Sequence, residues 1–95
     1  MGAYLMLSNL TDEGAETIKK NPARIKEVNK EVEAWGAKIL AQYAVLGPFD
    51  FVTILEAPSS EVVARVSIEL GSRGSVKIQT LPMIPIDTFI ASMKP

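Results

Sequence analysis

Residues 37–56 have the sequence AKILAQYAVLGPFDFVTILE, and this stretch decides the fold. Apolar residues recur at every second position from Ile39 to Val45, which is the period of a β-strand. Gly47 and Pro48 then form a turn. Residues 49–56 are rich in aromatic and β-branched residues, which favour strands. The sequence therefore predicts a β-hairpin over residues 37–56.

A strand and a long helical segment precede the hairpin. Ala3–Ser8 is a short, nearly continuous apolar run, and its length favours a buried strand. Thr11 is typical of a helix N-cap, and apolar residues recur at helical spacing as far as Trp35. We predict one long helix over Thr11–Trp35, with a bend or break near Pro22.

A second helix, a fourth strand and a tail follow the hairpin. Residues 58–61 (PSSE) have the capping residues of a helix start, and Gly71 marks its end. Ser75–Leu81 alternates between apolar and polar residues, which predicts a strand. Ile84–Met93 has apolar residues at near-helical spacing, and we expect one or two helical turns there that pack on a neighbour.

The predicted order is β-α-β-β-α-β with a tail, in one domain of residues 1–95. Two right-handed β-α-β crossovers give a four-stranded antiparallel sheet with both helices on one face. The sequence therefore predicts an α+β fold in which the second face of the sheet has no helix over it.

The face without helices is expected to carry four large apolar residues, namely Leu40, Phe51, Leu55 and Leu81. A patch of this size is too large to leave in water on a soluble monomer. We therefore expect a homodimer, in which a two-fold partner presents the same patch. The alternative is that the tail, Pro85–Met93, folds back over this face within one chain.

The composition excludes several classes of function. Ten basic and eleven acidic residues leave a net charge of −1 without a basic cluster, which argues against a nucleic-acid partner. The chain has no histidine and no cysteine, so we expect no metal site and no cofactor that needs them. No signal peptide or membrane span is recognisable, which favours a cytoplasmic protein without a membrane partner.

Residues 46–52, LGPFDFV, resemble the signature of the GYD family, in which a glycine, an aromatic residue and an aspartate follow the hairpin turn. The resemblance covers nearly the whole chain, including LTDEG at residues 10–14, the helix end at Trp35-Gly36 and the tail after Leu81-Pro82. It implies a ferredoxin-like, dimeric α+β-barrel fold. The family is largely without an assigned activity, and Phe49 replaces a tyrosine whose phenol could have donated a proton.

Asp50 and Tyr43 are the candidate catalytic residues. The Asp50 carboxylate is a candidate base at the mouth of a cavity; in a structural role it accepts hydrogen bonds from backbone amides and fixes the hairpin. The Tyr43 phenol is a candidate proton donor; in a structural role its ring packs and its hydroxyl points to an edge. The sequence leaves both alternatives open.

Four further residues are candidates for ligand binding, namely Tyr4, Arg24, Trp35 and Phe49. Arg24 is expected in a first helical turn, where backbone amides also favour anions, although a solvated helix face is the simpler explanation. Tyr4 has the other phenol of the chain. Trp35 continues the apolar stripe of the helix, which is typical of a core residue.

Three functions fit these observations. The leading hypothesis is a homodimer that binds a small molecule between sheet and helices and has no strong acid–base set. One alternative is a cofactor-independent oxygenase or isomerase that acts on a small activated substrate through Asp50 and Tyr43. The other is a purely structural protein that forms oligomers and uses no cavity.

Overall fold

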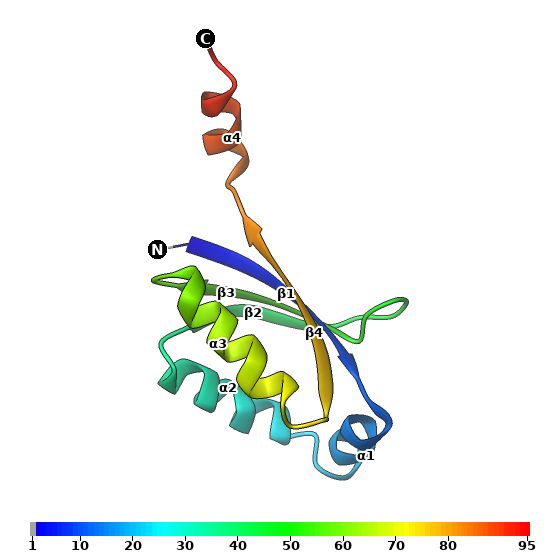
Figure 1. Cartoon of the computed structure of the whole chain (residues 1–95). Helices are drawn as coiled ribbons and strands as arrows, with labels where there is room; N and C mark the ends of the chain where they lie inside the picture. Colours follow the sequence, from blue (N-terminus) through cyan, green and yellow to red (C-terminus); the bar gives the residue numbers. More distant parts are fainter. Residues whose placement is uncertain (1) are drawn as a thin grey trace.

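The computed structural model describes residues 2–95 as one sheet with helices packed against it (Figure 1). The elements, in chain order, are β1 (Gly2–Leu10), α1 (Asp12–Lys20), α2 (Arg24–Ala34), β2 (Lys38–Ala44), β3 (Phe51–Ala57), α3 (Ser60–Gly71), β4 (Val76–Met83) and α4 (Ile86–Ser92). The predicted element order is confirmed, and the first helical segment is divided in two at the break predicted near Pro22.

The strands lie in the order β2-β3-β1-β4, and every neighbouring pair is antiparallel. This is the order of a ferredoxin-like sheet, in which each β-α-β unit leaves room for a strand of the other unit. Helix α2 contacts β2, and α3 contacts β3 and β4, so both helices cover the same face (Figure 1). The predicted ferredoxin-like α+β fold is confirmed.

Side-chain caps begin two of the helices. The Thr11 hydroxyl accepts a hydrogen bond from the Gly14 amide at 3.1 Å, and the Ser59 hydroxyl accepts one from the Val62 amide at 3.3 Å. Each bond satisfies an amide that has no partner within the first helical turn. Both helix starts agree with the predicted caps.

The long helix predicted over residues 11–35 is two helices, α1 and α2, separated at residues 21–23. Asn21 has φ −143° and ψ 81°, outside the helical range, and Pro22 has no amide hydrogen with which to continue α1. The break lets α1 contact β1 while α2 contacts β2. It therefore sets the two helices over different parts of the sheet.

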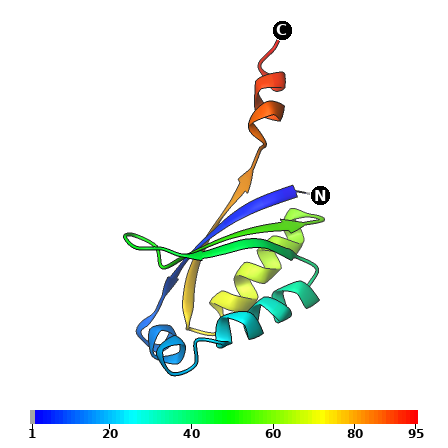
Figure 2. The ribbon, with the colours of Figure 1, turned by 180° about the vertical axis from the view of Figure 1, so that it is seen from behind.

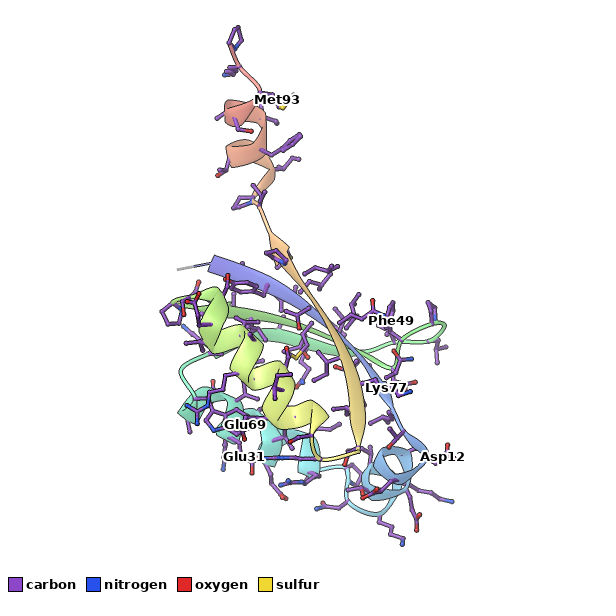
Figure 3. The ribbon with its side chains drawn as sticks, viewed as in Figure 1. Asp12, Glu31, Phe49, Glu69, Lys77 and Met93 are labelled. Atoms are coloured by element: carbon purple, nitrogen blue, oxygen red, sulfur yellow. The ribbon has the colours of Figure 1, made fainter. Side chains whose placement is uncertain are left out.

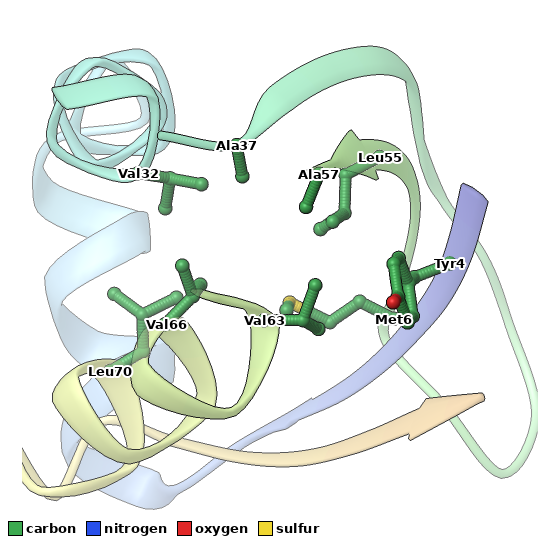
Figure 4. Close-up of a cluster of buried hydrophobic side chains, with 9 residues drawn as sticks. All are labelled: Tyr4, Met6, Val32, Ala37, Leu55, Ala57, Val63, Val66 and Leu70. Carbon is green, nitrogen blue, oxygen red and sulfur yellow. The ribbon is translucent and has the colours of Figure 1, made fainter. Parts of the chain in front are cut away.

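Strands β1 and β3 meet helices α2 and α3 in one apolar core (Figure 4). Its buried members are Tyr4, Met6, Val32, Ala37, Leu55, Ala57, Val63, Val66 and Leu70. Trp35 is half-buried and packs against this cluster. The core role that the apolar stripe of α2 predicts for Trp35 is therefore confirmed.

The two faces predicted for β3 are inverted. Leu55 is 0% exposed and Thr53 is 4% exposed, so both point to the helices, and Phe51 shares their parity. Phe51 and Leu55 are therefore not on the uncovered face, where we expected them. The alternation of apolar and polar residues could not decide which side of β3 faces the helices, because residues 51–55 are apolar at both parities except for Thr53. The Thr53 hydroxyl is tolerated in the interior because it accepts a hydrogen bond from Gln42.

A bulge between Ile39 and Ala41 changes the facing of β2. Leu40 is the extra residue at this bulge and is 47% exposed. Beyond it, Gln42 lies opposite Thr53 and also points to the helices. A strict two-residue period cannot hold through a bulge, so Ile39 and Gln42, which lie at opposite parities in the sequence, both face the helices.

Strand register defines the face that no helix covers. Leu5 lies between Ile54 and Leu81, and Leu7 lies opposite Val52. We call this surface the open sheet face; its apolar residues are Ala3, Leu5, Leu7, Ala41, Tyr43, Val52, Ile54, Leu81 and Met83, and the polar residues Lys38, Glu56, Lys77 and Gln79 lie on it as well. Leu81 is on this face, as predicted.

Helix α4 extends away from the rest of the molecule (Figures 1 and 2). All of its residues are exposed, including Ile86, Phe89 and Ile90, and the molecule measures 54 Å along its longest axis. The alternative in which Pro85–Met93 covers the open sheet face is therefore wrong. The expected helical turns are present, but they do not pack on this chain.

Candidate functional site

A cavity of about 150 Å³ lies between the helices and the sheet. Residues from α1, α2, the end of α3 and all four strands line it. Most of its wall is apolar, with Leu10, Ile25, Val28, Phe51, Val76 and Ile78 among the lining residues. The cavity is smaller than the roughly 300–1,000 Å³ of sites for drug-sized ligands, so it suits only a small molecule.

Three hydrogen-bonded side chains cross one wall of the cavity. Asn29 Nδ2 donates to Gln42 Oε1 at 2.7 Å, and Gln42 Nε2 donates to Thr53 Oγ1 at 3.1 Å. This network satisfies the buried Thr53 hydroxyl as an acceptor and links α2, β2 and β3. The hydroxyl accepts in this bond, so its own hydrogen is left to donate.

Ser8 is the other buried polar residue of the cavity wall. It is 9% exposed, and within residues 2–95 its hydroxyl has no hydrogen-bond partner, while its carbonyl accepts from the Asp50 amide at 2.9 Å. No side-chain nitrogen or oxygen of the described residues is both sealed off and unpaired. The Ser8 hydroxyl must therefore open onto the cavity that Ser8 lines.

Two arginines lie at the rim of the cavity, each paired with a glutamate. Arg24 contacts Glu27 at 3.3 Å and Arg73 contacts Glu31 at 2.6 Å, and the two arginine side chains are 35% and 33% exposed. Arg73 also lies 5.7 Å from the ring centre of Trp35. Its hydrogen bond to Glu31 lowers the pKa of that carboxyl. The rim therefore has two cations and two anions in close pairs.

Asp50 connects the hairpin to the end of β1. Its carboxylate accepts a hydrogen bond from the Leu10 amide at 2.8 Å, and its own amide donates to the Ser8 carbonyl. The structural alternative for Asp50, in which backbone amides occupy the carboxylate, agrees with these bonds. The carboxylate does not line the cavity.

Tyr43 is 59% exposed and lies on the open sheet face, opposite Val52. The cavity is on the other side of the sheet, so the Tyr43 phenol does not reach it. The structure therefore does not bring Asp50 and Tyr43 together at the cavity as an acid–base pair.

Only Arg24 of the four predicted ligand-binding residues lines the cavity. Tyr4 is in the core, where its hydroxyl lies 3.0 Å from the Ser60 hydroxyl, and Trp35 packs beside the same core. Phe49 lies on the β2–β3 hairpin, away from helices α2 and α3 (Figure 3). Tyr4, Trp35 and Phe49 therefore do not line the cavity.

Ser8 and Thr53 line the cavity but were not among the predicted site residues. Both had a recognisable signal: each is a single hydroxyl in a buried strand whose neighbours at the same parity are apolar, as Met6 and Leu10 are around Ser8. Phe51 and Leu55, which we expected at a dimer interface, line the cavity instead.

Two further observations concern the described part of the chain. Residues 2–95 contain no group of three or more Asp or Glu side chains placed to hold a metal ion. None of the helices in this range is long and apolar enough to cross a bilayer. The cytoplasmic location stays a prediction.

Comparisons with known proteins give a family and one full-length relative. A family model described as GYD domain matches residues 4–93. A protein of Thermus thermophilus, named glutamine synthetase and cystathionine beta-lyase binding protein, is 55% identical over 95 residues, which are 99% of this chain and 100% of that protein. A crystal structure described as a dimeric ferredoxin-like protein from an uncultured marine organism is 12% identical, with a TM-score of 0.47, and the match covers 90% of this chain and 95% of that chain.

Proposed function

This chain belongs to the GYD family, and we propose that it is a homodimeric binding protein. Its proposed ligands are partner enzymes at its surface and a small molecule in its cavity, and neither role requires catalysis by the chain. The observation that carries the proposal is the 55% identity, over nearly all of both chains, to a protein named for the enzymes it binds.

The proposed partner enzymes are glutamine synthetase and cystathionine β-lyase, the two that the name of the Thermus relative gives. The test is surface plasmon resonance with this chain immobilised, the two purified Thermus enzymes in solution, and the relative as positive control. We expect saturable binding of both enzymes to both proteins. Binding by the relative but not by this chain would refute the assignment of these partners.

The open sheet face supports the homodimer. It presents large apolar residues from β1, β3 and β4, such as Leu5, Ile54 and Leu81, and within residues 2–95 no helix covers it. A two-fold axis would bury this face against its own copy. Helix α4 supports the same arrangement, because an isolated seven-residue helix is not stable in water, and a second copy would supply a surface for the exposed Phe89 and Ile90.

Oligomeric state tests this part of the proposal. Light scattering at micromolar concentration should give twice the chain mass of 10.3 kDa, and removal of the residues after Met83 should weaken the dimer because it deletes α4. A full-length protein that stays monomeric at this concentration contradicts the homodimer.

The cavity between sheet and helices supports small-molecule binding, since a purely structural protein has no need of one. A ligand that binds only the folded state raises the melting temperature, so a thermal-shift screen against metabolites is the direct test. A broad screen without any stabilising compound would count against this role. We do not propose the oxygenase or isomerase, because neither Asp50 nor Tyr43 lines the cavity.

A further inference from the structure

Ser8 is the feature of the cavity wall that points to a ligand. On β1 the other residues of its parity are Gly2, Tyr4, Met6 and Leu10, so Ser8 is the one aliphatic hydroxyl on the helix-facing side of this strand. It is 9% exposed and without a partner among residues 2–95. Because this hydroxyl is not sealed off from the cavity, it is free to form a hydrogen bond with the polar group of a ligand.

A second hydroxyl lies on the adjacent strand. Met6 lies opposite Thr53, and Ser8 opposite Phe51, so Ser8 and Thr53 are diagonal neighbours on the same face of the sheet. Thr53 already accepts from Gln42 and keeps its hydrogen for donation. The cavity wall thus offers two buried hydroxyl groups on adjacent strands within one small, mostly apolar space.

The size and charge of the cavity narrow the class of ligand. Its volume of about 150 Å³ is close to that of an engineered cavity that takes up benzene, roughly 150 Å³, so one six-membered ring fits. Both rim arginines are paired with glutamates. A charged ligand would have to compete with these pairs, whereas a neutral one leaves them in place.

We infer that the cavity binds a neutral compound of about one six-membered ring that carries a single hydroxyl or carbonyl group, with Ser8 as its hydrogen-bonding anchor. This inference rests on the small-molecule part of the proposed function and adds the chemical class. Ring atoms contact apolar residues such as Val28 and Ile78, and the polar group lies at Ser8, within reach of Thr53.

The test compares phenol with benzene, which lacks only the hydroxyl, on the full chain and on Ser8→Ala. Titrations are followed through the methyl NMR signals of Val28 and Ile78. We expect phenol to bind Ser8→Ala about five- to tenfold more weakly than the unchanged protein, the usual effect of one neutral hydrogen bond, and benzene to bind both equally. Ser67→Ala is the matched control, because the Ser67 hydroxyl bonds to Thr80 outside the cavity; it should bind phenol as the unchanged protein does.

A second variant tests the location without relying on Ser8. Val28→Phe places a ring in the cavity from α2 and should abolish the binding of both probes, whereas Val62→Phe, on α3 and outside the cavity wall, should not. Benzene binding with no additional effect of the phenol hydroxyl at Ser8 overturns the ligand class but leaves small-molecule binding standing. Failure of both probes and of the metabolite screen, with only water in the cavity, overturns both.

Discussion

Both faces of the sheet carry many apolar residues, but they differ in what covers them, and the open sheet face also carries Lys38, Glu56 and Lys77. On the helix-facing side, Met6 and Leu55 are 4% and 0% exposed and belong to the core. On the open sheet face, Leu5 and Ile54 are only half-buried, and Leu81 is 48% exposed. A β-strand with apolar residues at both parities is expected where both faces are covered, and this expectation is the basis of the proposed homodimer.

The largest effect that separates the two faces should come from Leu55→Ala. Loss of a fully buried leucine side chain removes apolar burial and leaves a cavity, which typically costs about 2–5 kcal/mol. Chemical denaturation should show this loss at every protein concentration, because Leu55 is covered by its own chain. A loss below about 0.5 kcal/mol, the range of surface substitutions, would mean that the helix-facing side is not the core.

Leu81→Lys should act on association rather than on folding. A charge in a buried two-fold interface lies near its own copy, and such like-charge contacts cost several kcal/mol, so the dimer dissociation constant should rise by about a hundredfold or more. Sedimentation velocity measures this change. The matched control is Ile68→Lys, because Ile68 is 73% exposed on α3 and away from the open sheet face. Equal effects of the two variants would contradict the dimer.

The periodicity of apolar residues in the sequence was sufficient to predict the helices and strands and their order along the chain. Hydroxyl caps at Thr11 and Ser59 begin two helices, and Pro22 breaks the first helical segment, as local chemistry predicts. These features depend on residues close together in the chain. The right-handed crossovers predicted the four-stranded antiparallel sheet, and the resemblance to the GYD family implied the ferredoxin-like fold, which agrees with the observed strand order.

The side of each strand that faces the helices and the residues that line the cavity were harder to predict, because both depend on contacts between residues distant in the chain. Periodicity specifies which residues of β3 share a face but not which face, and the buried Thr53 was misleading because only the structure reveals its bond to Gln42. The bulge at Leu40 likewise follows from pairing between strands. The cavity wall comes from seven elements, so the single hydroxyl on the apolar side of β1 marks Ser8 as unusual but does not reveal the cavity that it lines.

A smaller effect on the helix-covered side is expected from Gly14→Ala. A β-carbon at Gly14 would lie 2.0 Å from the carbonyl oxygen of Ser75, so α1 must move away from the start of β4. Such overpacking typically costs about 1–3 kcal/mol. The movement should also lengthen the hydrogen bond from the Thr11 amide to the Ser75 carbonyl, 3.0 Å here, and hydrogen exchange at the Thr11 amide would detect it. Ala15→Ser, one position along on the exposed side of α1, is the control; similar stability of Gly14→Ala and the unchanged protein would contradict the close contact.

The smallest expected effect on stability comes from Glu31→Gln, a substitution on the surface of the helix layer. The Arg73 hydrogen bond lowers the pKa of Glu31 below its ordinary value of 4.5, so the charged form is favoured in the folded state. The contribution of Glu31 to stability is therefore present above that value and is lost as the pH falls through the lowered folded pKa. Glu31→Gln should be slightly less stable than the unchanged protein near neutral pH, and the difference should disappear in acid.

Urea denaturation at a series of pH values measures this difference. Glu33→Gln is the control, because it removes a carboxylate from the same helix that forms no ion pair within residues 2–95. The stability difference should be small and should weaken with added salt, because the side chains of Arg73 and Glu31 are 33% and 38% exposed. A difference that persists unchanged in acid would assign the role of Glu31 to packing. The Arg73–Glu31 ion pair would then add nothing to the stability of the helix-covered side, and the two faces of the sheet would differ in apolar burial alone.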